Sequence, residues 1–283
     1  MQQKTIFITG CSSGIGHDAA LALSRRGHRV IASCRKVEDV KKIIALGLEA
    51  VQMDMNDEQS IASAFAEVLK MTAGHLDVLI NNAGYGQAGA LEDLSRTTLR
   101  EQFETNVFGL MDLTKWVIPI MRQQKQGRII NISSILGLIS LPFRGAYNAS
   151  KYAVEGLSDT LRLELKPSGI EVICIEPGPI ASRFRDNVIE HSLAKIKMEE
   201  SHFQAQYQKM LNGFREQKEE SAFTGGTDAV ITKLIHAIEA KNPKAKYRVT
   251  FPAHLLAFLK RILSVRMLDR LLATLSKKEL GRD

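Results

Sequence analysis

The sequence has few cysteines and no long apolar segment. Its 283 residues include three cysteines, at positions 11, 34 and 174, and none of them lies in a CxxC or other metal-ligand spacing. Such a small and odd number is typical of a reducing compartment, so we expect a cytoplasmic protein. No run of about 18 apolar residues is present, and no basic segment followed by an apolar one opens the chain. We therefore expect neither a membrane-spanning helix nor a signal peptide.

Acidic residues are scarcer than basic ones. Lys and Arg number 38 against 31 Asp and Glu, which gives a net charge of +7. Residues 251–283 hold seven bases and three acids and supply +4 of that excess. The rest of the chain is close to balanced, so we expect no nucleic-acid partner. The seven histidines show no metal-ligand spacing with Cys, Asp or Glu, and no metal site is expected.

The sequence does contain a regular alternation of short apolar runs and longer helical patterns, as far as about position 250. Most of the runs lack polar alternation, as in Val172–Ile175, which is typical of strands buried on both faces of a parallel sheet. Segments between them carry apolar residues at three- and four-residue spacing, as in Ile15–Arg26, Gln59–Met71 and Ala146–Leu165. Strands are expected over Thr5–Thr9, Arg29–Ser33, Ala50–Met53, Val78–Asn81, Arg128–Ser133, Glu171–Glu176 and Tyr247–Thr250.

This repetition of strand and helix indicates βαβ units with right-handed crossovers. We predict one α/β domain over residues 1–250, with a doubly wound, Rossmann-type parallel sheet of seven strands and helices on both faces. The 45% hydrophobic and 24% charged residues are those of an ordinary globular domain. No repeat, low-complexity tract or linker divides it.

The first expected strand runs into a glycine-rich turn, Thr9–Gly16, after which the chain becomes helical. Gly10, Gly14 and Gly16 would allow a tight turn and a close approach of the backbone to a pyrophosphate at the helix N-terminus. The turn lacks the Gly-Lys-Ser/Thr of a P-loop. A glycine cluster can serve a tight turn alone, but its place after the first buried strand favours a dinucleotide site.

The second expected strand is followed by Arg35, and no acidic residue lies between Asp18 and Glu38. NAD sites usually have Asp or Glu in this stretch to bind the adenosine ribose hydroxyls. A guanidinium suits a 2′-phosphate instead. We therefore predict NADP(H) as the preferred cofactor, with NAD(H) as the alternative.

Tyr147 and Lys151 begin another expected helix. Their spacing of four residues places them on one stripe of that helix. A Tyr-x-x-x-Lys pair alone occurs often by chance, so its meaning depends on the other motifs of the chain.

With those motifs, the chain resembles the short-chain dehydrogenase/reductase family through position 250. Within the family it is most similar to the hydroxysteroid- and retinol-dehydrogenase-like branch and its bacterial aldehyde-reductase relatives. The resemblance implies an NADP(H)-dependent oxidoreductase that transfers a hydride between nicotinamide and an apolar aldehyde, ketone or alcohol, retinoid-like or steroid-like. The matching pieces, in order, are Thr9–Gly16, Asp54, Asn81-Asn82-Ala83-Gly84, Asn106, Ser133-Ser134, Tyr147-x-x-x-Lys151 and Pro177-Gly178.

The resemblance implies catalytic roles for four residues. Tyr147 would exchange a proton with the reacting oxygen, and Lys151 would lower the pKa of that tyrosine and hold the nicotinamide ribose. Ser134 would hydrogen-bond the carbonyl oxygen. Asn106 would anchor a water that links Lys151 to solvent.

The resemblance also implies a set of cofactor contacts, which includes Tyr147 and Lys151. Asn81 could equally serve only to stabilise the sheet. The other expected contacts are Gly10, Ser12, Ser13, Gly14, Ile15 and Gly16 at the phosphates, Arg35 at the 2′-phosphate, Asp54 and Met55 at the adenine, Asn81, Ala83 and Gly84 at the adenosine ribose, and Pro177, Gly178 and Ile180 at the nicotinamide.

The longest departure from the alternation is Pro179–Thr224, which is rich in Lys, Glu, Gln and Met. It is either a cover laid over the site or an ordinary insertion. We predict a mobile cover, because ligands in open α/β sheets bind beyond the carboxyl ends of the strands, and this segment leaves such an end. Together with Asn82–Leu91 and Leu136–Arg144 it would set substrate specificity. Its expected sealing residues are Val188, Ile189, Leu193, Ile196 and Phe214.

The tail, residues 251–283, carries a basic amphipathic pattern. Apolar residues over Pro252–Leu275 form one face of a single expected helix. Such a helix packs on its own domain or on a second subunit, or it lies on a membrane surface. We favour packing on the same domain, where the helix would also narrow the substrate mouth, since Asp269 interrupts the bases. Those bases are Lys260, Arg261, Arg266 and Arg270.

Three alternatives stay open beside the leading interpretation. They are an NAD-dependent alcohol dehydrogenase of the same fold, a dinucleotide-sensing protein without turnover, and a membrane-peripheral protein attached through the tail. Intact Ser134, Tyr147 and Lys151 speak against a loss of turnover. We also expect a homo-oligomer, either a dimer or a tetramer.

Overall fold

The computed structural model describes residues 2–181, 192, 194–215 and 223–280. Within them, seven parallel strands form one sheet in the order β3-β2-β1-β4-β5-β6-β7. The predicted doubly wound parallel sheet is thus confirmed, and each strand lies within a few residues of its expected place. The strands are β1 (Thr5–Ile8), β2 (Arg29–Cys34), β3 (Glu49–Gln52), β4 (Val78–Asn81), β5 (Gly127–Ile132), β6 (Ile170–Pro177) and β7 (Lys246–Val249).

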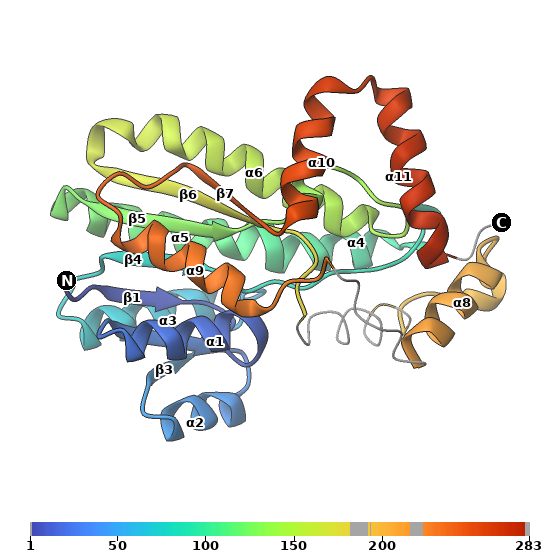
Figure 1. The fold of residues 1–283 in the computed structure, drawn as a ribbon. Helices are drawn as coiled ribbons and strands as arrows, with labels where there is room; N and C mark the ends of the chain where they lie inside the picture. The colour runs from blue at the N-terminus through green and yellow to red at the C-terminus, as the bar shows by residue number, and fades with distance from the viewer. Residues whose placement is uncertain (1, 182–191, 193, 216–222, 281–283) are drawn as a thin grey trace.

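Helices cover both faces of the sheet (Figure 1). The ten α-helices of the described residues are accompanied by short 3₁₀ segments and one π-helical turn, η2 (Glu104–Phe108). Two of the 3₁₀ segments, η1 (Leu91–Asp93) and η3 (Ile135–Gly137), bear on the site. The α-helices are α1 (Gly14–Arg25), α2 (Val37–Ala45), α3 (Glu58–Met71), α4 (Arg96–Phe103), α5 (Gly109–Gln124), α6 (Gly145–Leu165), α8 (Gln204–Arg215), α9 (Thr227–Glu239), α10 (Phe251–Ile262) and α11 (Val265–Leu280).

Alternate residues of most strands enter two separate cores, whereas the edge strand β7 buries only Tyr247 and Val249. Ile6 and Ile8 of β1 pack in the core that α1, α2 and α9 cover. Phe7, between them, points to the opposite face, in the core that α3, α5 and α6 cover. Because both faces of the strands are buried, the strands are apolar runs without polar alternation, as the sequence predicts.

The register of the sheet places the carboxyl ends of the strands along one edge, to the right in Figure 1. Ile8 of β1 pairs with Ile80 of β4 and with Ala32 of β2, so these three strands end side by side. From β1, the sheet extends through β2 and β3 on one side and through β4, β5, β6 and β7 on the other. The edge beyond β1 and β4 is therefore the switch point, where ligands bind in open α/β sheets.

The tail differs from its prediction, because it contains two helices rather than one. The chain is extended at Leu263, and α11 starts at Val265. Ser264 favours the break: its carbonyl oxygen accepts from the amides of Met267 and Leu268, both at 3.0 Å, and satisfies amides of the first turn of α11. The two helices form a hairpin beside the carboxyl edge of the sheet (Figure 1).

The hairpin packs on the domain through small and apolar side chains next to η3. Ala253 and Ala257 of α10 and Leu272 of α11 are buried against Ile135 and Ile139. Ile135 belongs to η3, directly after the predicted catalytic Ser134. The tail therefore lies next to the site.

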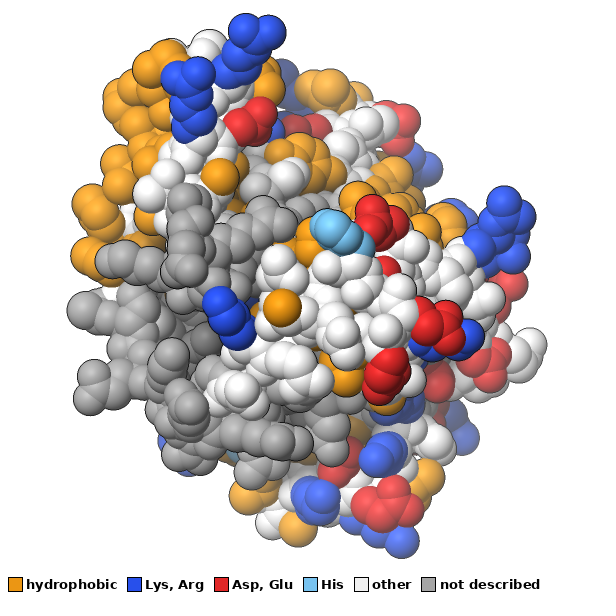
Figure 2. Space-filling model, turned by 90° about the vertical axis from the view of Figure 1, so that its right-hand side faces the viewer, with side chains coloured by type: hydrophobic (Ala, Val, Ile, Leu, Met, Phe, Trp, Pro, Cys, Tyr) orange, Lys and Arg blue, Asp and Glu red, His pale blue; other side chains and the backbone are white. Residues whose placement is uncertain are grey.

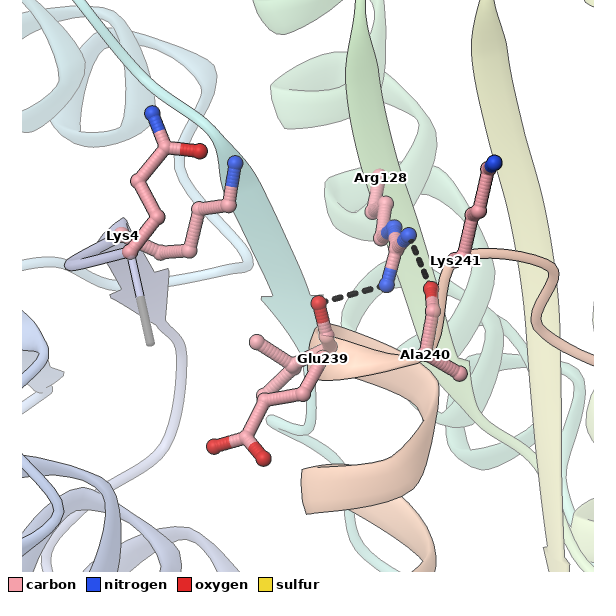
Figure 3. Close-up of a pocket in the computed structure, with 7 residues that line it drawn as sticks. Lys4, Arg128, Glu239, Ala240 and Lys241 are labelled. Carbon is pink, nitrogen blue, oxygen red and sulfur yellow. Dashed lines mark hydrogen bonds between the residues drawn. The ribbon is translucent and has the colours of Figure 1, made fainter.

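The amino end of the sheet holds a hollow of about 210 Å³. In it, the Arg128 guanidinium donates to the carbonyl oxygens of Ile238 and, at 2.6 Å, Ala240 (Figure 3). It also donates to the Ala237 carbonyl oxygen at 2.7 Å. Arg128 thus caps the end of α9 and fastens that helix to β5. The hollow lies at the edge opposite to the predicted catalytic residues, and we assign it a structural role. Its lining is Gln2, Lys4, Arg128, Ile238, Glu239, Ala240 and Lys241.

Candidate active site

The glycine-rich turn is held against the end of β4 by a set of short hydrogen bonds. The hydroxyl of buried Thr9 accepts from the amides of Asn82 at 3.0 Å and Ala83 at 2.8 Å. The Asn82 side-chain amide donates in return to the carbonyl oxygens of Thr9 at 2.9 Å and Gly10 at 3.0 Å. Thr9 and Asn82 were not among the predicted site residues, although both belong to the quoted motifs.

Two glycines of the turn have no room for a side chain. A Cβ on Gly10 would lie 2.7 Å from the Ala83 Cα, and Gly10 also has a φ of +72°, which favours glycine. A Cβ on Gly16 would lie 2.4 Å from the Gly10 carbonyl oxygen. The backbone therefore turns as tightly as a pyrophosphate-binding loop requires.

The N-terminus of α1 opens onto this turn. Ser13 is the N-cap residue, and its side chain makes no capping hydrogen bond. The first amides of α1 therefore lack the side-chain acceptor that α3 has in Asp57 and α4 in Ser95. Such a terminus, with its partial positive charge, suits a phosphate. The predicted Ser12, Gly14 and Ile15 lie at the same place.

Arg35, Asp54 and Met55 lie along the ends of β2 and β3. Arg35 is exposed, and within the described residues no ion pair engages its guanidinium. The Asp54 carboxylate accepts from the Asn56 amide at 3.0 Å, and Met55 is buried. Arg35 is thus free to meet an anion, and Asp54 is held in place by its own loop.

Asn81 lies apart from the turn. Its side chain is buried and donates to Thr114 Oγ1 at 3.0 Å and to Asn131 Oδ1 at 2.9 Å, which ties β4 to α5 and β5. This is the sheet-stabilising role that the sequence left open. Of the Asn81–Gly84 segment, Ala83 and Gly84 lie beside the turn and the Lys151 side chain, whereas Asn81 has only its backbone to offer a ligand.

Tyr147 and Ser134 meet at the edge of the sheet beyond β5. Tyr147 lies in the first turn of α6, and Ser134 lies between β5 and η3. Burial raises the pKa of Tyr147 to about 12, while a hydrogen bond with Ser134 and the positive charge of Arg144 act in the opposite direction. Tyr147 is therefore protonated at neutral pH and can donate to an oxygen placed between the two hydroxyls.

Lys151 lies one turn further along α6, on the same side as Tyr147. Its ammonium donates to the Ile132 carbonyl oxygen at 2.7 Å and lies 5.7 Å from the centre of the Tyr147 ring. Burial lowers the pKa of Lys151 to about 8, and Glu155 and Cys174 act in the opposite direction. Lys151 thus brings a positive charge close to the Tyr147 ring, and the pKa of Lys151 itself is near neutrality.

Asn106 lies in the π-helical turn η2, between α4 and α5. Its side chain donates to the Tyr85 carbonyl oxygen at 2.9 Å and to Ser150 Oγ at 3.1 Å, and accepts from the Tyr85 amide at 3.1 Å. A Cβ on Gly84 would lie 3.0 Å from Asn106 Oδ1 and 3.9 Å from Lys151 Nζ. The structure therefore brings Asn106, Gly84 and Lys151 together.

A buried group of charges lies behind Lys151, and the sequence did not predict it. The Glu155 carboxylate, one turn beyond Lys151, accepts from Lys246 Nζ of β7 at 2.7 Å. Glu176, at the end of β6, is fully buried, and its Oε2 lies 3.1 Å from Nε of Arg248. Burial, and after it the negative charge of Glu155, raises the pKa of Glu176 to about 7. The spacing of Glu155 from Lys151, a further i, i+4 step, was the signal available in the sequence.

Pro177, Gly178 and Ile180 continue from β6 along the same edge. The Gly178 amide donates to the Val249 carbonyl oxygen at 3.0 Å. Ile180 bridges to Gly225, where the chain returns, and the Ala181 amide donates to the Gly225 carbonyl oxygen at 2.9 Å. The two ends of the predicted cover are thus joined at its base.

The described part of the predicted cover is fastened to the domain. Ser192 Oγ accepts from the Ala88 amide at 2.8 Å. The buried Tyr207 hydroxyl accepts from the Ala90 amide at 2.8 Å and donates to Asp93 at 2.7 Å. Ile196 is buried in the same cluster. Val188, Ile189 and Leu193 and the Phe214 side chain lie outside the described residues.

A groove of about 750 Å³ lies between η1, the loop before α6, Phe203 and the side of α6 that carries Asn148 and Tyr152. Ser134, Tyr147 and Lys151 are not among its lining residues, because Tyr147 and Lys151 lie on a different stripe of α6. Its walls come from both segments that the sequence predicts to set specificity, Asn82–Leu91 and Leu136–Arg144. Most of its lining is apolar, with the Glu92 side chain as the one charged group. The lining is Gly89, Ala90, Leu91, Glu92, Ser140, Leu141, Pro142, Phe143, Gly145, Asn148, Ala149, Tyr152 and Phe203.

Comparison with known proteins places this site in a family. A family model described as short chain dehydrogenase matches residues 4–192, and the chain belongs to that family of oxidoreductases. It is 42% identical over 272 residues to the uncharacterized oxidoreductase YbbO of Escherichia coli K12, across 96% of this chain and 95% of that protein. It is 36% identical over 207 residues to human retinol dehydrogenase 8, across 70% of this chain and 64% of that protein.

Solved structures give the same result. The structure of ElxO with NADP bound matches with a TM-score of 0.70 and 25% identity, and the match covers 88% of this chain and 97% of that one. The fold and the family that the sequence predicts are thereby confirmed.

Proposed function

We propose that the protein is an NADP(H)-dependent oxidoreductase that transfers a hydride between nicotinamide and an apolar aldehyde, ketone or alcohol. The observation that carries this proposal is the meeting of Ser134, Tyr147 and Lys151 at the switch-point edge of the sheet, beside an uncapped helix N-terminus. Membership of the short-chain dehydrogenase family supports the reaction type.

The residues present fit a dinucleotide phosphate. The turn at Gly10 and Gly16 leaves no space for a side chain, and the first amides of α1 lack a side-chain acceptor. Arg35 would hold the 2′-phosphate, as the bound NADP of the ElxO relative supports. The nicotinamide would supply the hydride, and the protein supplies orientation and charge.

The protein's own groups would manage the proton. Tyr147 donates its hydroxyl proton to the carbonyl oxygen during reduction and takes it back during alcohol oxidation. Ser134 donates a hydrogen bond to the same oxygen and stabilises the negative charge that develops there. The Lys151 ammonium lowers the pKa of Tyr147 in the working complex and, with Asn106, connects it to water.

We infer an apolar substrate, retinoid-like, steroid-like or a simple aldehyde. The name of the relative retinol dehydrogenase 8 supports this class, and so do the mostly apolar residues that segments 82–91 and 136–144 contribute to the groove. The NAD-dependent dehydrogenase of the same fold is the second candidate, and the free guanidinium of Arg35 speaks for NADP(H) instead.

A turnover screen of aldehydes, retinoids and steroids, with NADPH and NADH in parallel, tests the proposal. Tyr147→Phe should lower the rate of carbonyl reduction at least about 10²-fold, because it removes only the proton donor. Ser134→Ala should lower it by about 10²–10³-fold. The control is Ser133→Ala, since the buried Ser133 hydroxyl has no hydrogen-bond partner among the described residues.

Unchanged circular dichroism and NADPH binding would show that the Tyr147→Phe variant is folded. Retained turnover in that variant would refute Tyr147 as the proton donor. A preference of the wild-type protein for NADH would refute the cofactor assignment.

We also propose that the protein forms a homo-oligomer in the cytoplasm. The exposed Phe108 and Trp116 of the α5 region and Leu163 of α6 support a self-contact on that side. Oppositely charged pairs surround them, Lys115 with Asp112 and Arg162 with Asp159, so two copies could meet without repulsion. The three cysteines, all buried and free, suit a reducing compartment.

A further inference from the structure

The hairpin of α10 and α11 carries a second apolar face, which the domain does not cover. Phe251, Leu255, Phe258 and Ile262 follow each other at spacings of four, three and four residues and form one stripe along α10. These side chains are between 41% and 64% exposed, whereas Ala253 and Ala257, on the side toward η3, are buried.

The apolar surface continues around the tip of the hairpin. Val265 and Met267, at the start of α11, are 75% and 54% exposed. At the base of the hairpin, the ring of Phe223 stacks on Phe251 at 6.1 Å between ring centres. We call the surface formed by Phe223, the α10 stripe, Val265 and Met267 the hairpin face. Figure 2 shows hydrophobic side chains gathered at the upper left, with Lys and Arg side chains along the top.

Solvent-exposed apolar surface of this extent, on one element, marks an interaction site in a soluble domain. The helical pattern explains why the sequence alone did not decide between packing of the tail on the domain and binding of the tail to another surface. One set of apolar residues on α10 packs on the domain, and a second set, about 100° or more around the helix, is exposed, with Phe251 stacked on Phe223 at its base. Packing and surface binding are therefore compatible in the same helix.

The charges at the hairpin face point to an anionic partner. Residues 251–276 contain Lys260, Arg261, Arg266 and Arg270 against one acid, Asp269. Lys260 is engaged with the domain, since its ammonium donates to the Leu138 carbonyl oxygen and lies 4.7 Å from the Tyr152 ring centre. The other three bases are exposed, and no ion pair among the described residues neutralises them.

A second copy of the chain fits this face poorly. In a two-fold contact each patch meets itself, so Arg261 and Arg266 of both copies would be brought together. The α5 and α6 side, where Lys115 and Arg162 are each paired with an acid, has no such conflict. Apolar side chains flanked by unpaired bases match the surface of a bilayer that contains anionic lipid.

We propose that the hairpin face docks the protein on anionic lipid membranes, with Phe258, Ile262 and Val265 entering the interface and Arg261 and Arg266 contacting the headgroups. No helix of the described residues is long and apolar enough to cross a bilayer, so the attachment is peripheral. Because the hairpin packs on η3, directly after Ser134, docking places the substrate side of the site at the lipid surface.

Sedimentation of the full-length protein with extruded vesicles tests this proposal. Two compositions are compared, phosphatidylcholine alone and phosphatidylcholine with about a third of phosphatidylglycerol. We expect binding to the anionic vesicles that weakens as salt is added, because the headgroup attraction is screened within about 10 Å at 0.1 M salt. Binding to phosphatidylcholine alone should be much weaker.

Two pairs of substitutions separate the apolar and the charged contribution. Phe258→Ser with Ile262→Ser should weaken vesicle partitioning at least about tenfold. Arg261→Gln with Arg266→Gln should weaken it about fivefold for each charge removed, on anionic vesicles only. Ile44→Ser with Leu46→Ser is the matched control: these side chains are both 53% exposed but lie at the end of α2, and partitioning should not change.

Absence of wild-type binding to anionic vesicles at low salt would overturn the proposal, and so would unchanged binding of the variant with Phe258→Ser and Ile262→Ser. Sedimentation velocity of that variant supplies a further check. A loss of oligomer there would make the hairpin face a self-contact and also overturn the proposal, whereas an unchanged oligomer supports it. All these readouts are independent of turnover, so a failure of the proposed reaction would leave them untouched.

Discussion

The two halves of the carboxyl edge are built in different ways. The cofactor half, around Gly10, Gly16 and Asn82, is held by short hydrogen bonds between the ends of two adjacent strands and leaves no space for an added side chain. The substrate half is made of segments from far along the chain, residues 192 and 194–210 and the hairpin, which contact the domain through a few polar anchors and small apolar clusters.

The difference shows where each kind of change is tolerated. In the cofactor half the backbone itself is the binding surface, so the addition of one carbon atom displaces it. In the substrate half, side chains make the surface, and the anchors at Ser192 and Tyr207 can stay while the lining changes. Affinity for the dinucleotide should therefore be fragile, and substrate preference should be adjustable without loss of the fold.

The largest effect is expected in the cofactor half, from Gly10→Ala. The new Cβ would clash with the Ala83 backbone, and the positive φ adds strain, so we expect a loss of about 2–5 kcal/mol in stability and more than about a hundredfold in NADPH affinity. Urea unfolding and NADPH titration measure both quantities. Gly47→Ala is the matched control, because Gly47 has a φ of +83° but nothing within 4 Å of its Cβ, and only the strain should remain. Equal losses in the two variants would show that the close contact is unimportant.

Arg35→Ala should have the next largest effect, confined to one cofactor. Loss of a charge-assisted hydrogen bond to the 2′-phosphate should weaken NADPH binding by about 1.5–3 kcal/mol and leave NADH binding nearly unchanged. Isothermal titration with both cofactors measures the difference. Lys41→Ala, an exposed base on α2, serves as control. If NADPH and NADH were weakened equally, Arg35 would not bind the 2′-phosphate.

Tyr207→Phe tests the substrate half. Without the hydroxyl, the buried Ala90 amide loses its acceptor, so we expect a loss of about 1–3 kcal/mol in the free energy of unfolding. NADPH affinity should stay as it is, in contrast to Gly10→Ala. Tyr152→Phe, whose hydroxyl donates to the Leu138 carbonyl oxygen at an exposed position, should cost less, at most about 1 kcal/mol. A parallel fall in NADPH affinity in the Tyr207→Phe variant would mean that the two halves are coupled.

The smallest effect is expected on the pH profile. Lys151 has a pKa of about 8, so it is charged below that pH and neutral above it, and the reduction rate should fall as pH rises through 8. The negative charge of Glu155 raises the pKa of Lys151. Glu155→Gln should therefore move the fall in rate to lower pH, by about one unit. The exposed Glu164→Gln on the same helix is the control, and identical profiles for the two variants would remove Glu155 from this role.

The sequence predicted the parts of the molecule that depend on local pattern. Short apolar runs located all seven strands, and most of these runs lack polar alternation because a strand buried on both faces does not alternate. The motif around Tyr147 and Lys151 located the candidate catalytic pair, since an i, i+4 pair fixes its own geometry once a helix forms.

The parts it missed depend on distant contacts. No local sequence pattern distinguishes Asn81 from Asn82. The Asn81 side chain ties β4 to β5, whereas the Asn82 side chain donates to the glycine-rich turn. The partner of Glu155, on α6, is Lys246, which lies far along the chain on β7. The break between α10 and α11 contains neither Gly nor Pro, so the helical pattern ran on across Ser264.

The position of Asn106 depends on the number of residues in the π-helical turn Glu104–Phe108. Such a turn accommodates one residue more than a regular helix, so every side chain from Gly109 onward is rotated by about 100° relative to an uninterrupted one. A deletion of one residue within the turn would put α4 and α5 back in phase, and the buried face of α5, with Leu113 and Val117, would then no longer match Asn106 against Gly84. The length of this segment therefore matters as much as its composition: substitutions at its exposed positions, such as Glu104, can be absorbed, and a change in its length cannot.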